Sequence, residues 1–549
     1  MGTSTEPCDV VVLGAGASGL AAALSAHEHG ARVRVLEKSA LVGGSAAISG
    51  GVVWVPDNPA MRRAGQNDSR DAALAYFRSL AGDALDESVL TAFVDQGPEA
   101  LRFLEQHTAL EWEVLDGYPD YYLDRPGALP YGGRALDSGL FSFERLGPWR
   151  ERVRDNGNPY RLKLGETPLG GGTGQLGTET IAQRLAADER GFGQSLVGAL
   201  LEACLARDIE PELNTDVVGL QREGERVIGV EVRSESGSIR VEARGGVLIC
   251  TGGFEWDEAL CRTFLRGPLD APASPPTNRG DGLRLAMSVG AQLGNMTSAW
   301  WAPTLAIPGD DWFGVQRAAP VLIERTAPHS LIVNRRGQRF CNEAANYSAL
   351  AGALHYRDPN AYDAVNLPCW LVFDATFRER YPVGPLMPGQ PTPAWLLERP
   401  TLAELAQALD IDADSLEATV ARFNGHAAAG RDPDFERGAS PYDLFYGDRS
   451  RAGTAATLGP LEKPPFFAVE LKSGALGTNG GPRTDPDGRV LDVHGAVIEG
   501  LFAAGNAMAG PTAHVYAGAG GTLGPALTFG YLAGRAAARQ RVNQAPRTA

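Results

Sequence analysis

The sequence predicts an α/β protein whose N-terminal part forms the start of a parallel sheet. Residues 10–13 are a short run of aliphatic and β-branched side chains, which is typical of a buried parallel strand. A glycine-rich turn and an alanine-rich stretch of helical composition follow directly. A second apolar strand, residues 32–36, then ends in Glu37. The order of strand, glycine turn, helix, strand and acid is that of a Rossmann-like dinucleotide-binding unit.

Each residue type in this unit has a physical reason. Gly14 permits the tight turn, Gly16 lets the backbone approach a pyrophosphate, and Gly19 lets helix and strand pack closely. The N-terminus of the following helix offers free N–H groups to the anion. Glu37, about 20 residues beyond the glycines, can accept hydrogen bonds from ribose hydroxyls.

Further small-residue segments recur at intervals along the chain. They are Gly43–Ser45 with Ser49–Gly51, the strand that ends at Thr251–Gly253, and the strand that leads to the turn at Gly505 and Asn506. In this order they resemble the flavin-binding half of the fumarate reductase and succinate dehydrogenase flavoprotein superfamily, which threads FAD between distant loops. The resemblance implies bound FAD. Residues 42–51 contain no histidine, so we expect the FAD to be non-covalent.

The motifs and this resemblance together predict a set of residues that contact the cofactor. The predicted set is Gly14, Gly16, Ala17, Ser18, Gly19, Glu37, Lys38, Gly43, Gly44, Ser45, Gly50, Gly51, Val217, Thr251, Gly252, Gly253, Asp281, Gly505, Asn506, Gly521 and Leu523.

The same landmarks predict two domains. Flavin motifs fill residues 1–300 and return only at 477–549, so these two ranges form one discontinuous FAD-binding domain. Residues 301–476 then form an inserted catalytic domain of mixed α+β composition.

Composition excludes several functions. There are 50 lysines and arginines against 66 aspartates and glutamates, a net charge of −16 that repels nucleic acid. The six cysteines form no CxxC pair and the eight histidines show no HxxxH or HxH spacing, so we expect neither disulfides nor a metal. No apolar run is long enough to span a membrane. We expect a cytoplasmic protein, and peripheral membrane association is left open.

The stretch "HVYAGAGGTLGP", residues 514–525, carries the most specific signal. Its glycines let the backbone pass close to a flat ring and aim N–H groups at a bound substrate. Fumarate reductases have an arginine here that holds a carboxylate, whereas this chain has Tyr516. A phenol can donate one hydrogen bond to a neutral carbonyl but cannot pair with a carboxylate as a guanidinium does. The site is therefore expected to bind a ketone.

Three stretches, residues 117–128, 334–350 and 514–531, resemble the 3-ketosteroid Δ1-dehydrogenases. The resemblance implies an enzyme that introduces a C1–C2 double bond into the A-ring of a 3-ketosteroid, with hydride passing to flavin N5. It also implies that Tyr347 takes the α-proton, that the Tyr516 hydroxyl and Gly520 N–H hold the ketone oxygen, and that Tyr121 supports the base. Tyr122 stands beside Tyr121 and leaves that last assignment open.

Several points stay open from sequence alone. We expect the substrate to be a small apolar ketone, either a steroid or a smaller cyclic ketone. We expect the electrons to pass to an external quinone-like or protein acceptor. A fumarate-reductase-like ene-reductase is disfavoured by Tyr516. A non-catalytic flavin electron-transfer subunit would contain FAD that no ketone reduces. The role of residues 165–195 is undecided.

Overall fold

The computed structural model describes residues 8–158, 161–234, 237–360 and 362–542. Its first sheet has the order β2–β1–β10–β22–β21, and β9 and β8 extend it from β10. β1 pairs in parallel with both β2 and β10, and β10 pairs in parallel with β22. The strands are β1 Cys8–Leu13, β2 Val33–Leu36, β8 Val217–Glu223, β9 Arg226–Ser234, β10 Gly237–Ile249, β21 Arg489–Leu491 and β22 Val497–Ala503.

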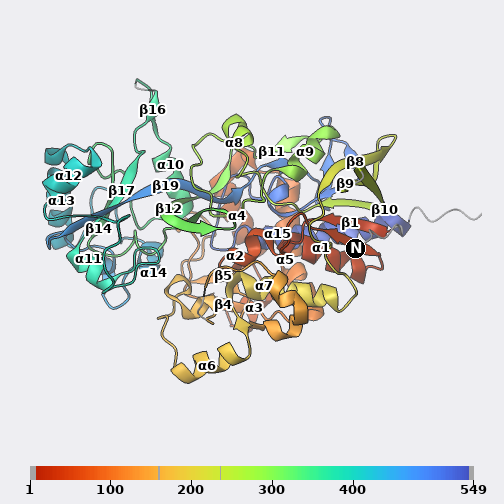
Figure 1. Cartoon of the computed structure of the whole chain (residues 1–549), viewed down its shortest axis with the longest axis horizontal. Coiled ribbons are helices and arrows are strands. Elements are labelled where there is room, and N and C mark those ends of the chain that lie inside the picture. The colour runs from red at the N-terminus through yellow and green to blue at the C-terminus, as the bar shows by residue number, and fades with distance from the viewer. Residues whose placement is uncertain (1–7, 159–160, 235–236, 361, 543–549) are drawn as a thin grey trace, which may run out of the picture.

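Helices cover this sheet and join distant parts of the chain. α1 Ala17–Glu28, which follows the glycine turn, packs against α15 Leu523–Val542 and α7 Phe192–Leu205. The glycine-rich stretch at 514–525 therefore ends in a helix that lies beside the first helix of the chain (Figure 1). The other helices of this region are α2 Gly44–Ile48, α3 Pro59–Arg63, α4 Arg70–Ala81, α5 Glu87–His107, α6 Thr178–Ala186, α8 Glu258–Phe264 and α9 Asp281–Ser288.

A second sheet, in the order β13–β12–β19–β17–β14 with β18 paired to β19, is antiparallel throughout. Its strands are β12 Ala299–Trp312, β13 Val315–Pro320, β14 Ser330–Asn334, β17 Cys369–Asp374, β18 Leu397–Arg399 and β19 Phe466–Thr478. The helices that accompany it are α10 Tyr347–Leu354, α11 Ala375–Arg380, α12 Leu402–Leu409, α13 Ala413–Ala428 and α14 Pro441–Phe445. Figure 1 shows this sheet and α11–α14 at the opposite end of the molecule from β1 and α1.

The second sheet separates two apolar cores, because side chains alternate between the faces of a strand. In β14, Ile332 contributes to one core, whereas Leu331 and Val333 contribute to the other. β17 follows the same rule, with Leu371 in the first core and Val372 in the second.

Short strand pairs complete the fold. They are β3 Val53–Trp54, β4 Glu113–Asp116 and β5 Gly132–Asp137 in one sheet, and the pairs β6 Phe141–Ser142 with β7 Glu189–Arg190, β11 Leu293–Gly294 with β20 Gly481–Pro482, and β15 Arg357–Asp358 with β16 Asp363–Ala364. Within the described ranges, no helix is both long and apolar enough to cross a membrane.

The fold is α/β, as the sequence predicts, with strand, glycine turn, helix and strand at the expected positions. The two predicted crossings between domains lie side by side, because Ala299 of β12 pairs with Thr478 of β19. The division of the chain at 300 and 477 stays a prediction.

Candidate active site

Residues from distant segments line one cavity of about 560 Å³, a size within the range of small-molecule sites. Most of the predicted cofactor residues contribute to its wall. Those that line it are Gly14, Gly16, Ala17, Ser18, Glu37, Lys38, Gly44, Ser45, Gly50, Gly51, Val217, Thr251, Gly252, Asp281, Gly505, Asn506 and Leu523.

Four predicted cofactor residues, Gly19, Gly43, Gly253 and Gly521, do not line the cavity. A Cβ atom at Gly19 would lie 1.9 Å from the carbonyl oxygen of Gly14, so this glycine packs α1 against the turn. A Cβ atom at Gly253 would lie 2.2 Å from the Thr478 hydroxyl oxygen. These two positions therefore shape the backbone behind the wall.

The nucleotide end of the cavity fits FAD. Gly14 adopts a φ of +99°, and a Cβ atom there would lie 2.5 Å from the carbonyl oxygen of Cys250. A Cβ atom at Gly16, by contrast, would meet no protein atom within 4 Å, so the chain leaves open space in front of the N-terminus of α1. The buried hydroxyl of Thr251, also on the wall, has no hydrogen-bond partner among the described residues. Space, helix N–H groups and an unpaired hydroxyl suit a pyrophosphate and its attached groups.

Glu37 is held in place on the same wall. Its two carboxylate oxygens accept hydrogen bonds from the backbone N–H groups of Ala15 and Ser39, each at 2.8 Å. Burial raises the pKa of Glu37, and these two N–H donors act in the opposite direction. The neighbouring Lys38 forms an ion pair with Asp281 at 2.5 Å. The predicted ribose-binding acid therefore has a fixed orientation beside the glycine turn.

Replacing Gly16 with valine is expected to weaken FAD binding without unfolding the protein. The φ of Gly16 is −82°, which any residue adopts, and the new side chain would occupy the open space of the cavity. Forcing extra methyl groups into an occupied site costs about 1–3 kcal/mol, which is roughly a 5- to 150-fold increase in the Kd of FAD. Flavin titration of the apoprotein measures this change. Gly425→Val, in α13 with no atom near its Cβ, is the control, and equal FAD affinity in both variants would contradict the prediction.

Three predicted catalytic tyrosines come together at the other end of the cavity. The ring centroids of Tyr347 and Tyr516 lie 5.4 Å apart, and Tyr121 lies 5.4 Å from Tyr347 and 5.5 Å from Tyr516. All three are buried. Tyr347, Tyr516 and Gly520 line the cavity, whereas Tyr121 lies behind the other two rings. The residues come from a loop after α5, the start of α10 and the loop before α15, so only the fold brings them together.

Burial controls the ionisation of this cluster. It raises the pKa of Tyr347 well above its ordinary value near 10, and the neighbouring phenol of Tyr516 acts in the same direction, whereas that of Tyr121 acts to lower it. Burial also raises the pKa of Tyr516, while the neighbouring groups of Tyr347, Thr522 and the Gly520 backbone act to lower it. Tyr516 and Gly520 both line the cavity at this end, as a pair that holds one ketone oxygen requires.

Tyr121, rather than Tyr122, belongs to the cluster. The Tyr121 hydroxyl is buried and has no hydrogen-bond partner among the described residues. It nevertheless lies close enough to Tyr347 to act on the pKa of that residue. Its backbone N–H donates to the carbonyl of Ala517 at 3.0 Å, and the Tyr76 hydroxyl donates to the same carbonyl at 2.8 Å. These bonds fix the Tyr121 loop against the residue after Tyr516.

The loop that carries Tyr347 rests on a buried charge network. Arg325 donates from Nη1 to the carbonyl of Glu343 and, at 2.6 Å, to that of Ala345. Asn346 caps α10 by accepting the N–H of Ala349 at 2.8 Å, and it donates to the carbonyl of Tyr121 at 3.2 Å. The residue before Tyr347 is thereby hydrogen-bonded to the backbone of Tyr121.

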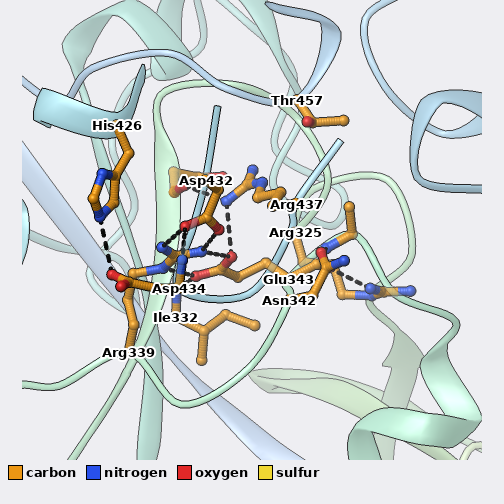
Figure 2. Close-up of polar contacts among 12 residues, drawn as sticks. Arg325, Ile332, Arg339, Asn342, Glu343, His426, Asp432, Asp434, Arg437 and Thr457 are labelled. Carbon is orange, nitrogen blue, oxygen red and sulfur yellow. Dashed lines mark hydrogen bonds and ion pairs between the residues drawn. The ribbon is translucent and has the colours of Figure 1, made fainter. Parts of the chain in front are cut away.

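Glu343, in the segment that leads to Tyr347, is fully buried, and its carboxylate lies between two guanidinium groups (Figure 2). It pairs with Arg339 at 2.7 Å and with Arg437 at 3.2 Å, and Arg339 also pairs with Asp432 at 2.8 Å. Burial alone would raise the pKa of Glu343, but the two guanidinium groups lower it to about 2. The network therefore stays charged and holds the loop rigidly.

One part of this region brings together side chains of the kind that bind metals. His426, Asp432 and Asp434 place one ligand atom each within 4.8 Å of one another. Asp432 is already paired with Arg339, and Asp434 is paired with Arg422 and His426. The guanidinium groups of Arg339 and Arg422 occupy oxygens of these carboxylates, so the cluster functions as part of the ion-pair network (Figure 2).

The cavity also contains residues that the sequence analysis did not predict. Tyr118 and Tyr446 line it, and their hydroxyls hydrogen-bond to each other. Tyr118 stands three positions before Tyr121, so its place in the same tyrosine-rich segment was the available signal. The segment 165–195, whose role the sequence leaves undecided, contributes Leu169 and Phe192 to the wall.

Comparison with known proteins agrees with this geometry. Residues 9–523 match the family described as FAD binding domain. The chain is 43% identical to 4-oxocyclohexanecarboxylate 2-dehydrogenase of Sinomonas cyclohexanicum, over 98% of this chain and 94% of that protein. It is 38% identical to 3-oxosteroid 1-dehydrogenase of Mycobacterium tuberculosis, over 96% and 98% respectively. A crystal structure of 3-ketosteroid Δ1-dehydrogenase from Sterolibacterium denitrificans, in complex with 1,4-androstadiene-3,17-dione, superposes with a TM-score of 0.89 at 34% identity, covering 97% of this chain and 100% of that one.

Fold, cavity and family match define a flavoprotein oxidoreductase that uses FAD and acts on CH–CH groups. The chain belongs to the FAD binding domain family and, within it, to the group that contains the 3-oxosteroid 1-dehydrogenases.

Proposed function

We propose that this enzyme removes two hydrogens from adjacent ring carbons of a 3-ketosteroid and forms the C1–C2 double bond of the A-ring. The observation that carries the proposal is the pair of buried phenols, Tyr347 and Tyr516, whose ring centroids are 5.4 Å apart on the cavity wall. The similarity to enzymes and to a complex named for 3-ketosteroids supports this substrate class.

The charges on the cavity wall agree with a neutral ketone. Among the described residues that line it, the only lysine and arginine are Lys38 and Arg154. Lys38 pairs with Asp281, and Arg154 donates at 3.0 Å to the hydroxyl of Ser39, so both lie next to Glu37. In the described part of the chain, no guanidinium on the wall faces the tyrosine cluster, so a carboxylate would have no cation there to pair with.

Bound FAD supplies the acceptor for the hydride that leaves the carbon β to the ketone. The Tyr516 hydroxyl and Gly520 N–H donate to the ketone oxygen and stabilise the negative charge that develops on it. This stabilisation acidifies the α-carbon, whose proton passes to the oxygen of Tyr347. Tyr121 stabilises the anionic form of Tyr347. The two electrons then pass to an external acceptor, quinone-like or protein, before the next turnover.

Anaerobic mixing with 4-androstene-3,17-dione tests the proposal. The flavin absorbance near 450 nm should bleach, and the product should be two hydrogens lighter by mass spectrometry. Bleaching by small cyclic ketones but by no steroid would favour the smaller substrate class. The 43% identity to 4-oxocyclohexanecarboxylate 2-dehydrogenase supports that alternative. FAD that no ketone reduces would overturn the proposal in favour of an electron-transfer subunit.

The rate of flavin reduction is expected to rise with pH across the alkaline range. Tyr347 must be ionised to accept a proton, and burial raises its pKa well above 10. The reactive fraction therefore grows about tenfold for each pH unit between 7 and 10. Stopped-flow reduction after a rapid pH jump measures this dependence in the folded protein. A rate that reaches a plateau near pH 7 would show that a different group accepts the proton.

A further inference from the structure

A carboxyl group that the proposed chemistry does not use lies on the cavity wall. Glu324 follows β13 in a short segment, and it lines the cavity together with Leu322 and Ile323. Its side chain is partly exposed, and Oε1 accepts the backbone N–H of Gly384 at 3.1 Å. The surrounding wall is apolar, and Pro382 lies nearby on it.

This segment belongs to the tyrosine end of the cavity. The hydroxyl of Thr326 donates to the carbonyls of Ile323, at 2.8 Å, and of Tyr446, at 2.7 Å. Tyr446 is hydrogen-bonded to Tyr118 on the same wall. Glu324 therefore lies where a substrate would extend, and not beside the nucleotide-binding glycines.

Glu324 has no ion-pair partner among the described residues. In the part of the chain that the structure describes, no lysine, arginine or histidine forms an ion pair with it. The adjacent Arg325 points elsewhere, since its Nη1 donates to the carbonyls of Glu343 and Ala345 and its Nε to that of Val321. Burial raises the pKa of Glu324, whereas backbone N–H groups, including that of Gly384, and the nearby charge of Arg325 favour its ionised form.

We propose that Glu324 determines the charge of the substrate, so that the enzyme accepts uncharged ring ketones and excludes those that carry a carboxylate. Two like charges repel strongly in a cavity of low dielectric constant, and a repulsive group of this kind is a common source of specificity. The inference rests on the proposed function. It narrows the proposed substrates to uncharged ring ketones, whereas one relative is named for a ring ketone that carries a carboxylate.

The test compares substrates that differ only in charge. The holoenzyme is assayed with 4-oxocyclohexanecarboxylate and its carboxamide, and with 3-oxo-4-androstene-17-carboxylate and its carboxamide. We expect kcat/KM to be at least about tenfold lower for the acid than for the amide in one or both pairs. In Glu324→Gln, whose side-chain oxygen can still accept the Gly384 N–H, the acid-to-amide ratio should rise about tenfold in the pair that is discriminated.

The matched control is Glu379→Gln, which removes an acid on the surface that pairs with Lys463. Its acid-to-amide ratio should equal that of the unchanged enzyme. Equal use of acid and amide by the unchanged enzyme, in both pairs, would overturn the inference even if the variant failed to fold. An unchanged ratio in a folded, FAD-loaded Glu324→Gln would overturn it as well. If the unchanged enzyme oxidised neither of the two amides nor 4-androstene-3,17-dione, that result would instead overturn the proposed function, and the inference with it.

Discussion

Replacing Tyr347 with phenylalanine is expected to lower the rate of flavin reduction by ketone about 10²- to 10⁴-fold. This range is typical for the loss of a positioned acid or base. The change removes one oxygen atom and keeps the ring, which packs against Tyr121 and Tyr516 at centroid distances of 5.4 Å. Because the phenol oxygen is the only group lost, folding and FAD content should stay unchanged. Anaerobic stopped-flow reduction at a saturating ketone concentration measures the effect.

A matched control separates this effect from the general loss of a phenol. Tyr362 is 81% exposed, so Tyr362→Phe should leave the rate unchanged. The Kd of the dienone product, titrated against the flavin spectrum, should change little in Tyr347→Phe, because Tyr516 and Gly520 still donate to the ketone oxygen. A variant that keeps more than about a tenth of the rate would show that Tyr347 is not the base.

The local order of the first sheet could be predicted from sequence because it depends on neighbouring residues. The run at 10–13, the glycines after it and the acid at Glu37 lie within one strand–helix–strand unit. Strand periodicity and glycine turns express short-range sterics, which a single sequence displays directly.

The meeting of Tyr121, Tyr347 and Tyr516 could be expected only through resemblance to a family. These residues are far apart in the chain, and their contact depends on how β12 and β19 carry the second sheet toward α15. No local pattern reports such a contact. The structure shows that the three rings meet, and their catalytic roles stay predictions that the variants above test.

The rest of the wall could not be predicted because its residue types are ordinary. Tyr446 and Glu324 follow no motif, and an isolated tyrosine or glutamate is usually a surface or packing residue. Only their position beside the cavity gives them chemical meaning. The buried ion-pair network around Glu343 could not be predicted either. Its members, such as Glu343 and Arg437, are separated by about 90 residues of sequence.

Replacing Glu343 with glutamine is expected to destabilise the folded protein by about 3–5 kcal/mol, the usual cost of removing one partner from a buried ion pair. The Glu343 side chain has no exposed area, and the change would leave Arg437 buried without its carboxylate partner. Because Glu343 belongs to the loop that leads to Tyr347, its replacement should also lower the rate of flavin reduction. Denaturant midpoints, followed by flavin release and by tryptophan fluorescence, measure the loss of stability.

The pH dependence gives this prediction a specific signature. The pKa of Glu343 is about 2 in the folded state, and in the unfolded chain it is about 4.5. A lowered pKa stabilises the fold fully above about pH 4.5, and this contribution, about 3 kcal/mol, is lost as the pH falls toward 2. The difference between unchanged protein and variant should therefore be constant from pH 8 to 5 and shrink below pH 4.5. Glu87→Gln, which breaks an exposed pair with Arg78, should lower the free energy of unfolding by less than about 1 kcal/mol. An equally small decrease in Glu343→Gln would show that the buried network does not stabilise the loop that leads to Tyr347.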